Sequence, residues 1–194
     1  LYNRNNLTDI VSQTTKNIFI PITVGGGIKN IEDAKKIFEF GADRVSINTG
    51  LVENPNLLNN LVEIYGSQAI LAYLEVTYYQ NEFILLTDNA RERSNINVKE
   101  WLDYLCKNGA GEILISFVDT EGTAKGINVD LVNKISENIT KPFLVHGGIG
   151  NIEHINNISE KTNADGVCIS SLIHYAELFK DRTVISKNAI LSEY

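Results

Sequence analysis

The 194-residue sequence contains no methionine and begins at Leu1. Because an unprocessed cytosolic chain begins with methionine, we expect the true start to lie upstream of Leu1. No apolar run approaches the roughly 18 residues of a membrane span, and the segment Leu1–Asn6 shows no charged-then-apolar signal peptide. The sequence therefore predicts a cytoplasmic protein without a membrane segment.

The sequence also contains few cysteines, and its acidic residues outnumber its basic residues. Cys106 and Cys168 lie far apart and in no Cys-x-x-Cys or Cys/His cluster, which predicts reduced, buried thiols and neither a disulfide framework nor a metal site. The net charge of −7 argues against a nucleic-acid-binding protein, although backbone donors can still bind a phosphate locally. The composition is that of an ordinary globular protein, and no linker divides residues 1–194, so we predict a single domain.

Short β-branched runs alternate with longer amphipathic stretches, which is the pattern of βα units around a parallel sheet. The predicted strands are Ile18–Val24, Arg44–Ile47, Ala69–Glu75, Glu112–Phe117, Pro142–Val145 and Gly166–Ile169. The predicted helices are Leu7–Gln13, Ile31–Phe40, Pro55–Tyr65, Val98–Asn108, Val129–Glu137 and Ile152–Lys161. The segment Glu82–Thr87 predicts a small hairpin behind the third strand.

Two parts of the sequence repeat each other. Pro21–Asn30 reads PITVGGGIKN and Pro142–Asn151 reads PFLVHGGIGN, and Ala42–Thr49 similarly matches Ala164–Ser171. Each copy predicts a strand, a glycine turn, a helix, a strand and a polar turn. One long period indicates two related half-domains. We therefore predict an α/β fold, a (βα)8 TIM barrel of two half-barrels in which this chain supplies strands 3–8 and lacks the first two βα units. Taken alone, we expect such a chain to be inactive and unable to close.

The repeated turns are candidate anion sites. Gly25–Gly27 ends a predicted strand and opens a helix, so its backbone N–H groups can approach an anion closely. Asn48 and Thr49 end the neighbouring strand, and Gly147–Gly148 with Ser170–Ser171 repeats the arrangement. Glycines also make tight strand-to-helix turns with no ligand. Because both copies carry hydroxyl or amide donors, we predict two phosphate sites facing each other and a ligand phosphorylated at both ends.

Carboxylates at strand ends are the candidate catalytic groups, since catalytic side chains in barrels project from there. Glu75 closes an otherwise apolar strand, where a charge needs a partner or a role. Asp119 and Glu121 follow the strand Glu112–Phe117, and a solvated loop carboxylate remains an alternative for Asp119. His146 can be a general base, a substrate donor or a turn residue, and we favour the interpretation that it contacts the substrate.

Several motifs resemble the cyclase subunit of imidazole glycerol phosphate synthase. They are VGGGI at 24–28, GADRVSINT at 41–49, VENP at 52–55, YGSQA at 65–69, GAGEIL at 109–114, DTEGT at 119–123 and HGG at 146–148. The resemblance runs from about Leu7 to Phe179 and fails in the tail from Lys180 to Tyr194. The SINT and ENP pieces fit the cyclase better than its sister barrel, the histidine-pathway isomerase. Members of that family are (βα)8 barrels of two half-barrels, in agreement with the repeat.

The resemblance implies a heterodimer in which ammonia from a partner glutaminase passes through the barrel to a bis-phosphorylated ribulosyl aminoimidazole carboxamide. Cyclisation and cleavage then give imidazole glycerol phosphate and an aminoimidazole carboxamide ribotide, with no metal or other cofactor. The phosphate-binding positions fall on Gly26, Gly27, Asn48, Thr49, Thr123, Gly147, Gly148, Ser170 and Ser171. The ammonia gate falls on Arg44 and Glu112, and a glutaminase contact on Asp43, although bottom-face charges also suit ordinary salt bridges.

The sequence departs from the family at its acid/base positions. The resemblance places the catalytic pair on a first-strand aspartate, absent from this chain, and on Glu121, while Glu75 replaces a supporting aspartate. As a mechanism hypothesis, the pair moves protons while Glu75 and Asp119 position groups and water. Since an added methylene displaces a carboxylate by about 1 Å, which can cost about a hundredfold in rate, the two glutamates indicate a reshaped pocket, in which Tyr73 adds bulk. Two alternatives stay open: an ammonia-delivering barrel in sugar amidation for surface polysaccharides, and a non-catalytic scaffold that activates a glutaminase.

Overall fold

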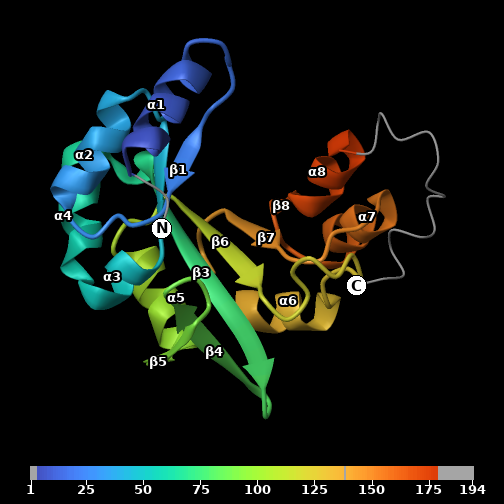
Figure 1. Cartoon of the computed structure of the whole chain (residues 1–194). Helices are drawn as coiled ribbons and strands as arrows, with labels where there is room; N and C mark the ends of the chain where they lie inside the picture. Colours follow the sequence, from blue (N-terminus) through green and yellow to red (C-terminus); the bar gives the residue numbers. More distant parts are fainter. Residues whose placement is uncertain (1–3, 138, 179–194) are drawn as a thin grey trace.

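The computed structural model describes residues 4–137 and 139–178, which are arranged around six parallel strands (Figure 1). Neighbours in the sheet follow the order β1, β2, β3, β6, β7 and β8, so that β1 and β8 each pair with one parallel strand. These strands are β1 Thr23–Gly25, β2 Arg44–Ile47, β3 Ile70–Tyr79, β6 Glu112–Phe117, β7 Phe143–His146 and β8 Gly166–Cys168. The predicted α/β fold is confirmed, and the sheet curls as part of a (βα)8 barrel.

The helices cover the convex outer side of the sheet. They are α1 Arg4–Thr15, α2 Ile31–Glu39, α3 Thr49–Glu53, α4 Asn56–Tyr65, α5 Val98–Lys107, α6 Val129–Ser136, α7 Ile152–Lys161 and α8 Ser171–Leu178, with a 3-10 turn at Ser67–Ala69. Four of them, α2, α5, α6 and α7, begin after an asparagine whose side-chain oxygen accepts a backbone N–H of the first turn. These N-caps explain why the helix starts were predictable to within a residue. None of the described helices has the length and apolar character needed to cross a membrane.

The structure differs from the prediction most at two strands and at three elements that were not predicted. The strand predicted at Ile18–Val24 is confined to β1, and Phe19 is 96% exposed, because Pro21 has no N–H to pair and β1 lies at the sheet edge. Strand β3 continues to Tyr79, past the expected end at Glu75, since β4 (Glu82–Thr87) pairs with its second half. Strand β5 (Glu92–Asn97), α3 and α8 were not predicted; each is short or directly continues a turn.

The two sequence repeats fold alike down to single hydrogen bonds. In the first copy, Asp43 Oδ2 accepts from the Ile22 N–H at 2.8 Å and the Asp43 N–H donates to the Ile22 carbonyl at 2.9 Å. In the second copy, Asp165 makes the same two bonds with Phe143, both at 2.9 Å. The repeat is therefore structural as well as sequential. Asp43, predicted at a glutaminase contact, has its carboxylate in this strand-starting bond.

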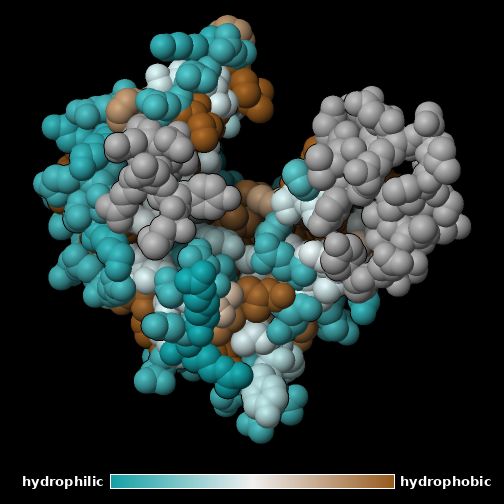
Figure 2. Space-filling view, viewed as in Figure 1, coloured by the Kyte–Doolittle hydropathy of each residue, from teal (hydrophilic) through white to brown (hydrophobic). Residues whose placement is uncertain are grey.

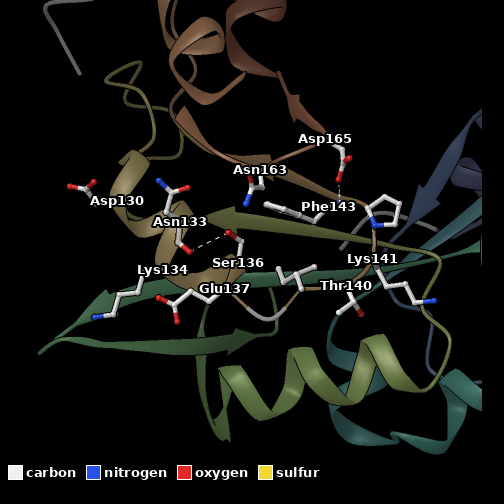
Figure 3. Close-up of a pocket in the computed structure, with 12 residues that line it drawn as sticks. Asp130, Asn133, Lys134, Ser136, Glu137, Thr140, Lys141, Phe143, Asn163 and Asp165 are labelled. Atoms are coloured by element: carbon white, nitrogen blue, oxygen red, sulfur yellow. Dashed lines mark hydrogen bonds between the residues drawn. The ribbon is translucent and has the colours of Figure 1, made fainter. Parts of the chain in front are cut away.

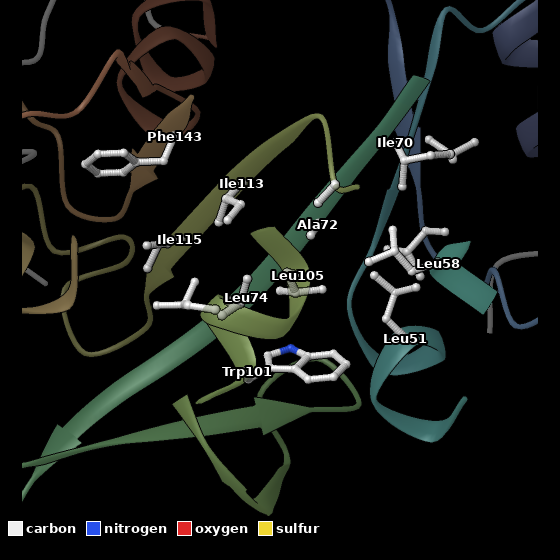
Figure 4. Packing of buried hydrophobic residues seen from close by; sticks show 14 of the residues in the cluster. Leu51, Leu58, Ile70, Ala72, Leu74, Trp101, Leu105, Ile113, Ile115 and Phe143 are labelled. Carbon is white, nitrogen blue, oxygen red and sulfur yellow. The ribbon is translucent and has the colours of Figure 1, made fainter. Parts of the chain in front are cut away.

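The hydrophobic core lies between the sheet and the outer helices (Figure 4). Side chains along β3 alternate: Ala72 and Leu74 are fully buried under the helices, whereas Leu71, Tyr73 and Glu75 line the inside of the barrel. Trp101 and Leu105 of α5 cover the outer face of β3 in the same layer. Polar side chains therefore collect on the inner, concave face of the sheet, and this face positions the site.

Candidate functional site

A cavity of about 750 Å³ occupies the inside of the barrel. In Figure 2 the molecule is hollowed between the side that carries β1 and the side that carries β8, with apolar surface in the floor of the hollow. From the amino to the carboxyl ends of the strands, the cavity is lined by Arg44 and Glu112, then by apolar residues and Tyr73, and then by Glu75, Asn48, Thr49 and the glycine turn Gly25–Gly27. Seven predicted site residues thus share one cavity: Gly26, Gly27, Arg44, Asn48, Thr49, Glu75 and Glu112.

The first glycine turn is open toward the cavity. Gly26 and Gly27 have φ angles of +111° and +67°, a left-handed backbone that favours glycine. A Cβ added at Gly26 would meet no atom within 4 Å, so the turn has space beside its backbone. The turn leads into α2, which begins at Ile31 after the Asn30 cap. The arrangement is what backbone recognition of an anion requires.

The side chain of Asn48 is bonded within the protein. Its Nδ2 donates to Glu75 Oε2 at 2.9 Å and to the Leu86 carbonyl at 3.0 Å, so both amide hydrogens are used within the protein. Its Oδ1 is buried and has no hydrogen-bond partner among the described residues. Thr49 Oγ1 accepts from the Asp88 N–H at 3.0 Å. In this structure Asn48 therefore orients Glu75, and its side chain has no hydrogen left for a phosphate.

Glu75 is poised to hold a proton. Burial raises the pKa of Glu75 above its ordinary value, and the nearby charges of Glu121 and Asp88 raise it further, while hydrogen bonds from Asn48 and the Ala90 N–H oppose the shift. Glu121 is exposed in the loop after β6, near enough to raise the pKa of Glu75 and of Tyr73. Two of the predicted catalytic carboxylates thus lie close together.

Asp119 is held by the β3 hairpin. Its two carboxylate oxygens accept from the Thr77 hydroxyl at 2.7 and 2.8 Å, and one of them accepts from the Tyr78 N–H at 3.1 Å. These bonds tie the loop after β6 to the second half of β3, beside the segment that carries Glu121. Asp119 consequently positions the loop that follows β6. This role differs both from the predicted catalytic role and from that of a solvated carboxylate.

An ion pair lies at the amino end of the cavity. Arg44 of β2 donates to Glu112 Oε2 of β6 at 2.8 Å, with the two side chains 37% and 21% exposed. This pair brings together the two residues predicted as an ammonia gate. Cys168 lies above it on β8, and burial with the charge of Glu112 raises the pKa of its thiol, which keeps it protonated. Cys106 of α5 is buried as predicted, whereas Cys168 is only partly buried, so the prediction of a buried thiol is wrong for Cys168.

The second glycine turn is packed against protein. Gly147 and Gly148 are buried, with φ angles of +125° and +68°, and a Cβ at Gly148 would meet the Thr120 carbonyl at 2.7 Å. Thr123 Oγ1 donates to the same carbonyl at 2.7 Å. Together with Ser170 and Ser171 after β8, these predicted residues gather at the carboxyl ends of β7 and β8, outside the lining of the 750 Å³ cavity.

Sequence reasoning missed a polar chain inside the barrel. Ser116 Oγ lies 2.9 Å from His146 Nδ1, and His146 Nε2 lies 3.3 Å from Ser170 Oγ. Tyr73 interacts with Ser116 on its other side. The signal was available, because Ser116 follows Glu112 and Leu114 at strand spacing and therefore faces inward with them.

A second hollow lies on the opposite side of β7 (Figure 3). Its volume is about 800 Å³, and α6, the start of β7 and the loop before β8 surround it. Asp165 points to the Phe143 N–H and Ser136 to the Asn133 carbonyl, so these polar groups are engaged in local structure. None of the predicted site residues lines this hollow.

Comparison with known proteins identifies the family. A family profile described as "Histidine biosynthesis protein" matches residues 1–179. The chain belongs to this histidine biosynthesis family. Relatives named imidazole glycerol phosphate synthase subunit HisF include one from Legionella pneumophila, 42% identical over 80% of this chain and 74% of that protein. Another from Clostridium botulinum is 36% identical over 90% of this chain and 70% of its own, and one from Leptospira biflexa is 36% identical over 90% and 69%. The (βα)8 barrel fold of this family accounts for both the repeat and the curled sheet.

Proposed function

We propose that this chain acts as the cyclase subunit of imidazole glycerol phosphate synthase. Its substrate is a ribulosyl aminoimidazole carboxamide with a phosphate at each end, and its products are imidazole glycerol phosphate and an aminoimidazole carboxamide ribotide. The names of its relatives and the match over residues 1–179 support this activity. We further propose that it works with a glutaminase subunit in the cytoplasm, where the ammonia is made and used.

One observation carries the proposal. The glycine turn that suits an anion, the carboxyl of Glu75 and the Arg44–Glu112 ion pair line a single cavity. Gly26 and Gly27 lie at the carboxyl end, Glu75 beside them, and the Arg44–Glu112 pair at the amino end. In barrels the carboxyl end of the strands carries the chemistry. An entry for ammonia at the opposite end delivers it to the substrate without passing through bulk water. The cavity therefore suits a reaction that joins ammonia to a phosphorylated ligand.

The chemistry requires proton transfer. Ammonia attacks as a neutral nucleophile, and closing the imidazole ring then requires protons to leave nitrogen and reach departing groups, which positioned carboxyls accelerate by about 10² to 10⁴. We assign proton transfer to Glu121 and positioning of substrate and water to Glu75, which Asn48 orients. Asp119 holds the Glu121 loop against the β3 hairpin.

The ammonia path begins at the Arg44–Glu112 pair. The two charges lie 2.8 Å apart, and in this proposal ammonia passes when the pair separates. Leu71, Leu114 and Leu144 line the next layer, an apolar passage that suits neutral ammonia better than ammonium. Docking of a glutaminase at the amino ends of the strands supplies ammonia directly at this gate.

The test is turnover of the bis-phosphorylated ribulosyl substrate with ammonium salts by the protein that carries this chain. Glu121→Gln keeps the side-chain size and removes the titrating group, so kcat should fall by about a hundredfold or more. Glu82→Gln, an exposed change on β4, is the matched control and should keep full activity. Absence of turnover in the unaltered protein while phosphate still binds would contradict the cyclase assignment.

The same variant separates the scaffold alternative. If the barrel only activates a glutaminase, Glu121→Gln leaves both glutaminase stimulation and product formation unchanged. If the barrel catalyses cyclisation, glutaminase stimulation persists while synthesis is lost. Transfer of nitrogen to a sugar in place of the ribulosyl compound would support the sugar-amidation alternative.

A further inference from the structure

We propose that Asn89, in the turn between β4 and β5, is a side-chain donor to an anion bound at the first glycine turn, a role that Asn48 does not fill. This inference rests on the proposed function, in which Gly26 and Gly27 receive one phosphate of the substrate. Asn89 is then a substrate-binding residue that the β4–β5 hairpin supplies from outside the two repeated segments.

The β4–β5 turn is hydrogen-bonded to the site at two points. The Asp88 N–H donates to Thr49 Oγ1 at 3.0 Å, and the Ala90 N–H donates to the Glu75 carboxylate. Asn89 lies between these two residues in the sequence and lines the same 750 Å³ cavity as the first glycine turn. The two bonds therefore hold Asn89 at the carboxyl end of the cavity, beside two of the predicted site residues.

The backbone of this turn is unusual. Asp88, Asn89 and Ala90 have φ angles of +50°, +56° and +59°, whereas left-handed residues other than glycine normally occur singly. Asparagine and aspartate adopt this conformation more readily than alanine does. Residues kept in such conformations by surrounding bonds cluster at ligand sites. The three left-handed residues therefore support a role of this turn in binding a ligand.

A close contact connects the β4–β5 turn to the first glycine turn through the start of α3. A Cβ added at Gly50 would lie 2.1 Å from the Ile28 carbonyl, so α3 begins in direct contact with the end of the glycine turn. Thr49, the residue before Gly50, accepts the Asp88 N–H. The glycine turn, Thr49 and the β4–β5 turn therefore form a continuous rim at the carboxyl end of the cavity.

Two other side-chain donors on this rim are already paired. Both hydrogens of the Asn48 amide are used within the protein, and the Lys29 ammonium lies 3.0 and 3.2 Å from the two carboxylate oxygens of Glu53. Asn89 is exposed, and its amide makes no hydrogen bond with the described residues. Asn89 therefore offers two N–H donors at the end of the cavity where the phosphate is placed.

The test is binding of inorganic phosphate to the protein that carries this chain. In ¹⁵N spectra the amide signals of Gly26 and Gly27 report the first turn, and those of Gly147 and Gly148 serve as an internal control. Asn89→Gly removes the side-chain donor and keeps a backbone that readily adopts the left-handed conformation. We expect it to weaken phosphate binding at the first turn by about tenfold, the effect of one hydrogen bond to a charged group, with the control signals unchanged.

Asn89→Asp separates a donor from a structural role. Aspartate adopts the left-handed backbone as asparagine does, but it has no N–H hydrogens and carries a charge of the same sign as phosphate. If Asn89 is a donor, Asn89→Asp binds phosphate more weakly than Asn89→Gly. If Asn89 only shapes the turn, Asn89→Asp keeps the affinity of the unaltered protein.

Asn81→Gly is the matched control. Asn81 is also exposed and left-handed, with a φ angle of +66°, but it lies in the β3–β4 turn and does not line the cavity. The same substitution there should leave phosphate binding at the first turn unchanged.

Three results would overturn the proposal: no phosphate response at Gly26 and Gly27 in the unaltered protein, unaltered affinity in Asn89→Gly, or unaltered affinity in Asn89→Asp. Failure of the cyclase assignment gives a different pattern, because the phosphate response of the Asn89 variants then stays as expected while the ribulosyl substrate is not converted.

Discussion

In the first copy of the repeat the residue that follows the second strand, Asn48, donates to Glu75, while its counterpart in the second copy, Ser170, lies beside His146. The backbones of the two copies agree in their glycine angles, their asparagine caps and their aspartate-to-strand bonds. The ionisable side chain beside each turn does not agree. The same backbone arrangement thus has a carboxyl beside the first turn and an imidazole beside the second, which is how a duplicated half-barrel can treat the two ends of one substrate differently.

The copies also differ in what surrounds their turns. A Cβ at Gly26 meets open space, whereas one at its counterpart Gly147 meets the Phe117 carbonyl at 2.6 Å and the Thr120 Oγ1 at 3.1 Å. Gly126 also donates its N–H to the Gly148 carbonyl at 2.7 Å. The second turn is therefore part of the packed structure as well as an anion site, and the first turn is largely free of that second task.

The largest predicted effect tests this difference in packing between the two glycine turns. Gly147→Ala forces both a left-handed alanine and a backbone clash, so we expect it to lower the free energy of unfolding by about 2–3 kcal/mol. Gly26→Ala has the left-handed strain alone and should cost about 1 kcal/mol. Urea unfolding followed by circular dichroism gives both values. Equal losses for the two variants would contradict the assigned difference.

A smaller effect is expected at the two equivalent aspartates. Asp165→Ala leaves the N–H of Phe143, a buried residue of an inner strand, without its acceptor, which should cost about 1–2 kcal/mol. Asp43→Ala releases the N–H of Ile22 at the edge of the sheet, where water can replace the carboxylate, and should cost less than about 1 kcal/mol. Unfolding midpoints of the two variants rank them, and a larger loss in Asp43→Ala would reverse the comparison.

The smallest effect concerns the pH dependence that Glu75 confers. Its pKa in the folded chain lies above the ordinary 4.5 of an unfolded carboxyl, so the folded chain binds this proton more tightly. The resulting stability is complete below pH 4.5 and is lost as pH rises through the folded pKa. Glu75→Gln keeps the acceptor for Asn48 and removes the titration. Its urea midpoint should therefore fall less than that of the unaltered chain as pH rises above 4.5.

Glu82→Gln controls for the loss of one negative charge, since Glu82 is exposed on β4. Its urea midpoint should follow the pH dependence of the unaltered chain. A Glu75→Gln profile that also matches the unaltered chain would show that Glu75 is not the group whose burial is linked to stability.

The sequence predicted most of the frame because local signals define it. The β-branched runs, the asparagine caps and the repeated glycine turns can each be recognised from a few consecutive residues. The failures arose where pairing between distant segments decides the outcome. Ile18 and Phe19 look like a strand, yet no neighbouring strand pairs with them in the described sheet, and β3 extends beyond Glu75 because β4 continues its pairing.

The same contrast between local signals and pairing of distant segments applies to the site. Its residue types were predicted from turns and strand ends, but their contacts depend on register. Ser116 meets His146 because β6 and β7 pair in that register, and Asn48 reaches Glu75 across neighbouring strands. The Asn48 amide was expected to serve a phosphate, and only the folded arrangement reveals that it serves a carboxyl. The acid/base, phosphate and gate roles remain predictions to be tested.

The central claim is that two unlike anion turns receive the two ends of one ligand. Isothermal titration of the chain with the bis-phosphorylated ribulosyl substrate, in the absence of ammonia, tests it directly. We predict one ligand per chain, displaced by inorganic phosphate that occupies two sites per chain, and loss of only one of those phosphate sites in His146→Asn. Binding of two bis-phosphorylated ligands per chain, or of a single inorganic phosphate, would contradict it.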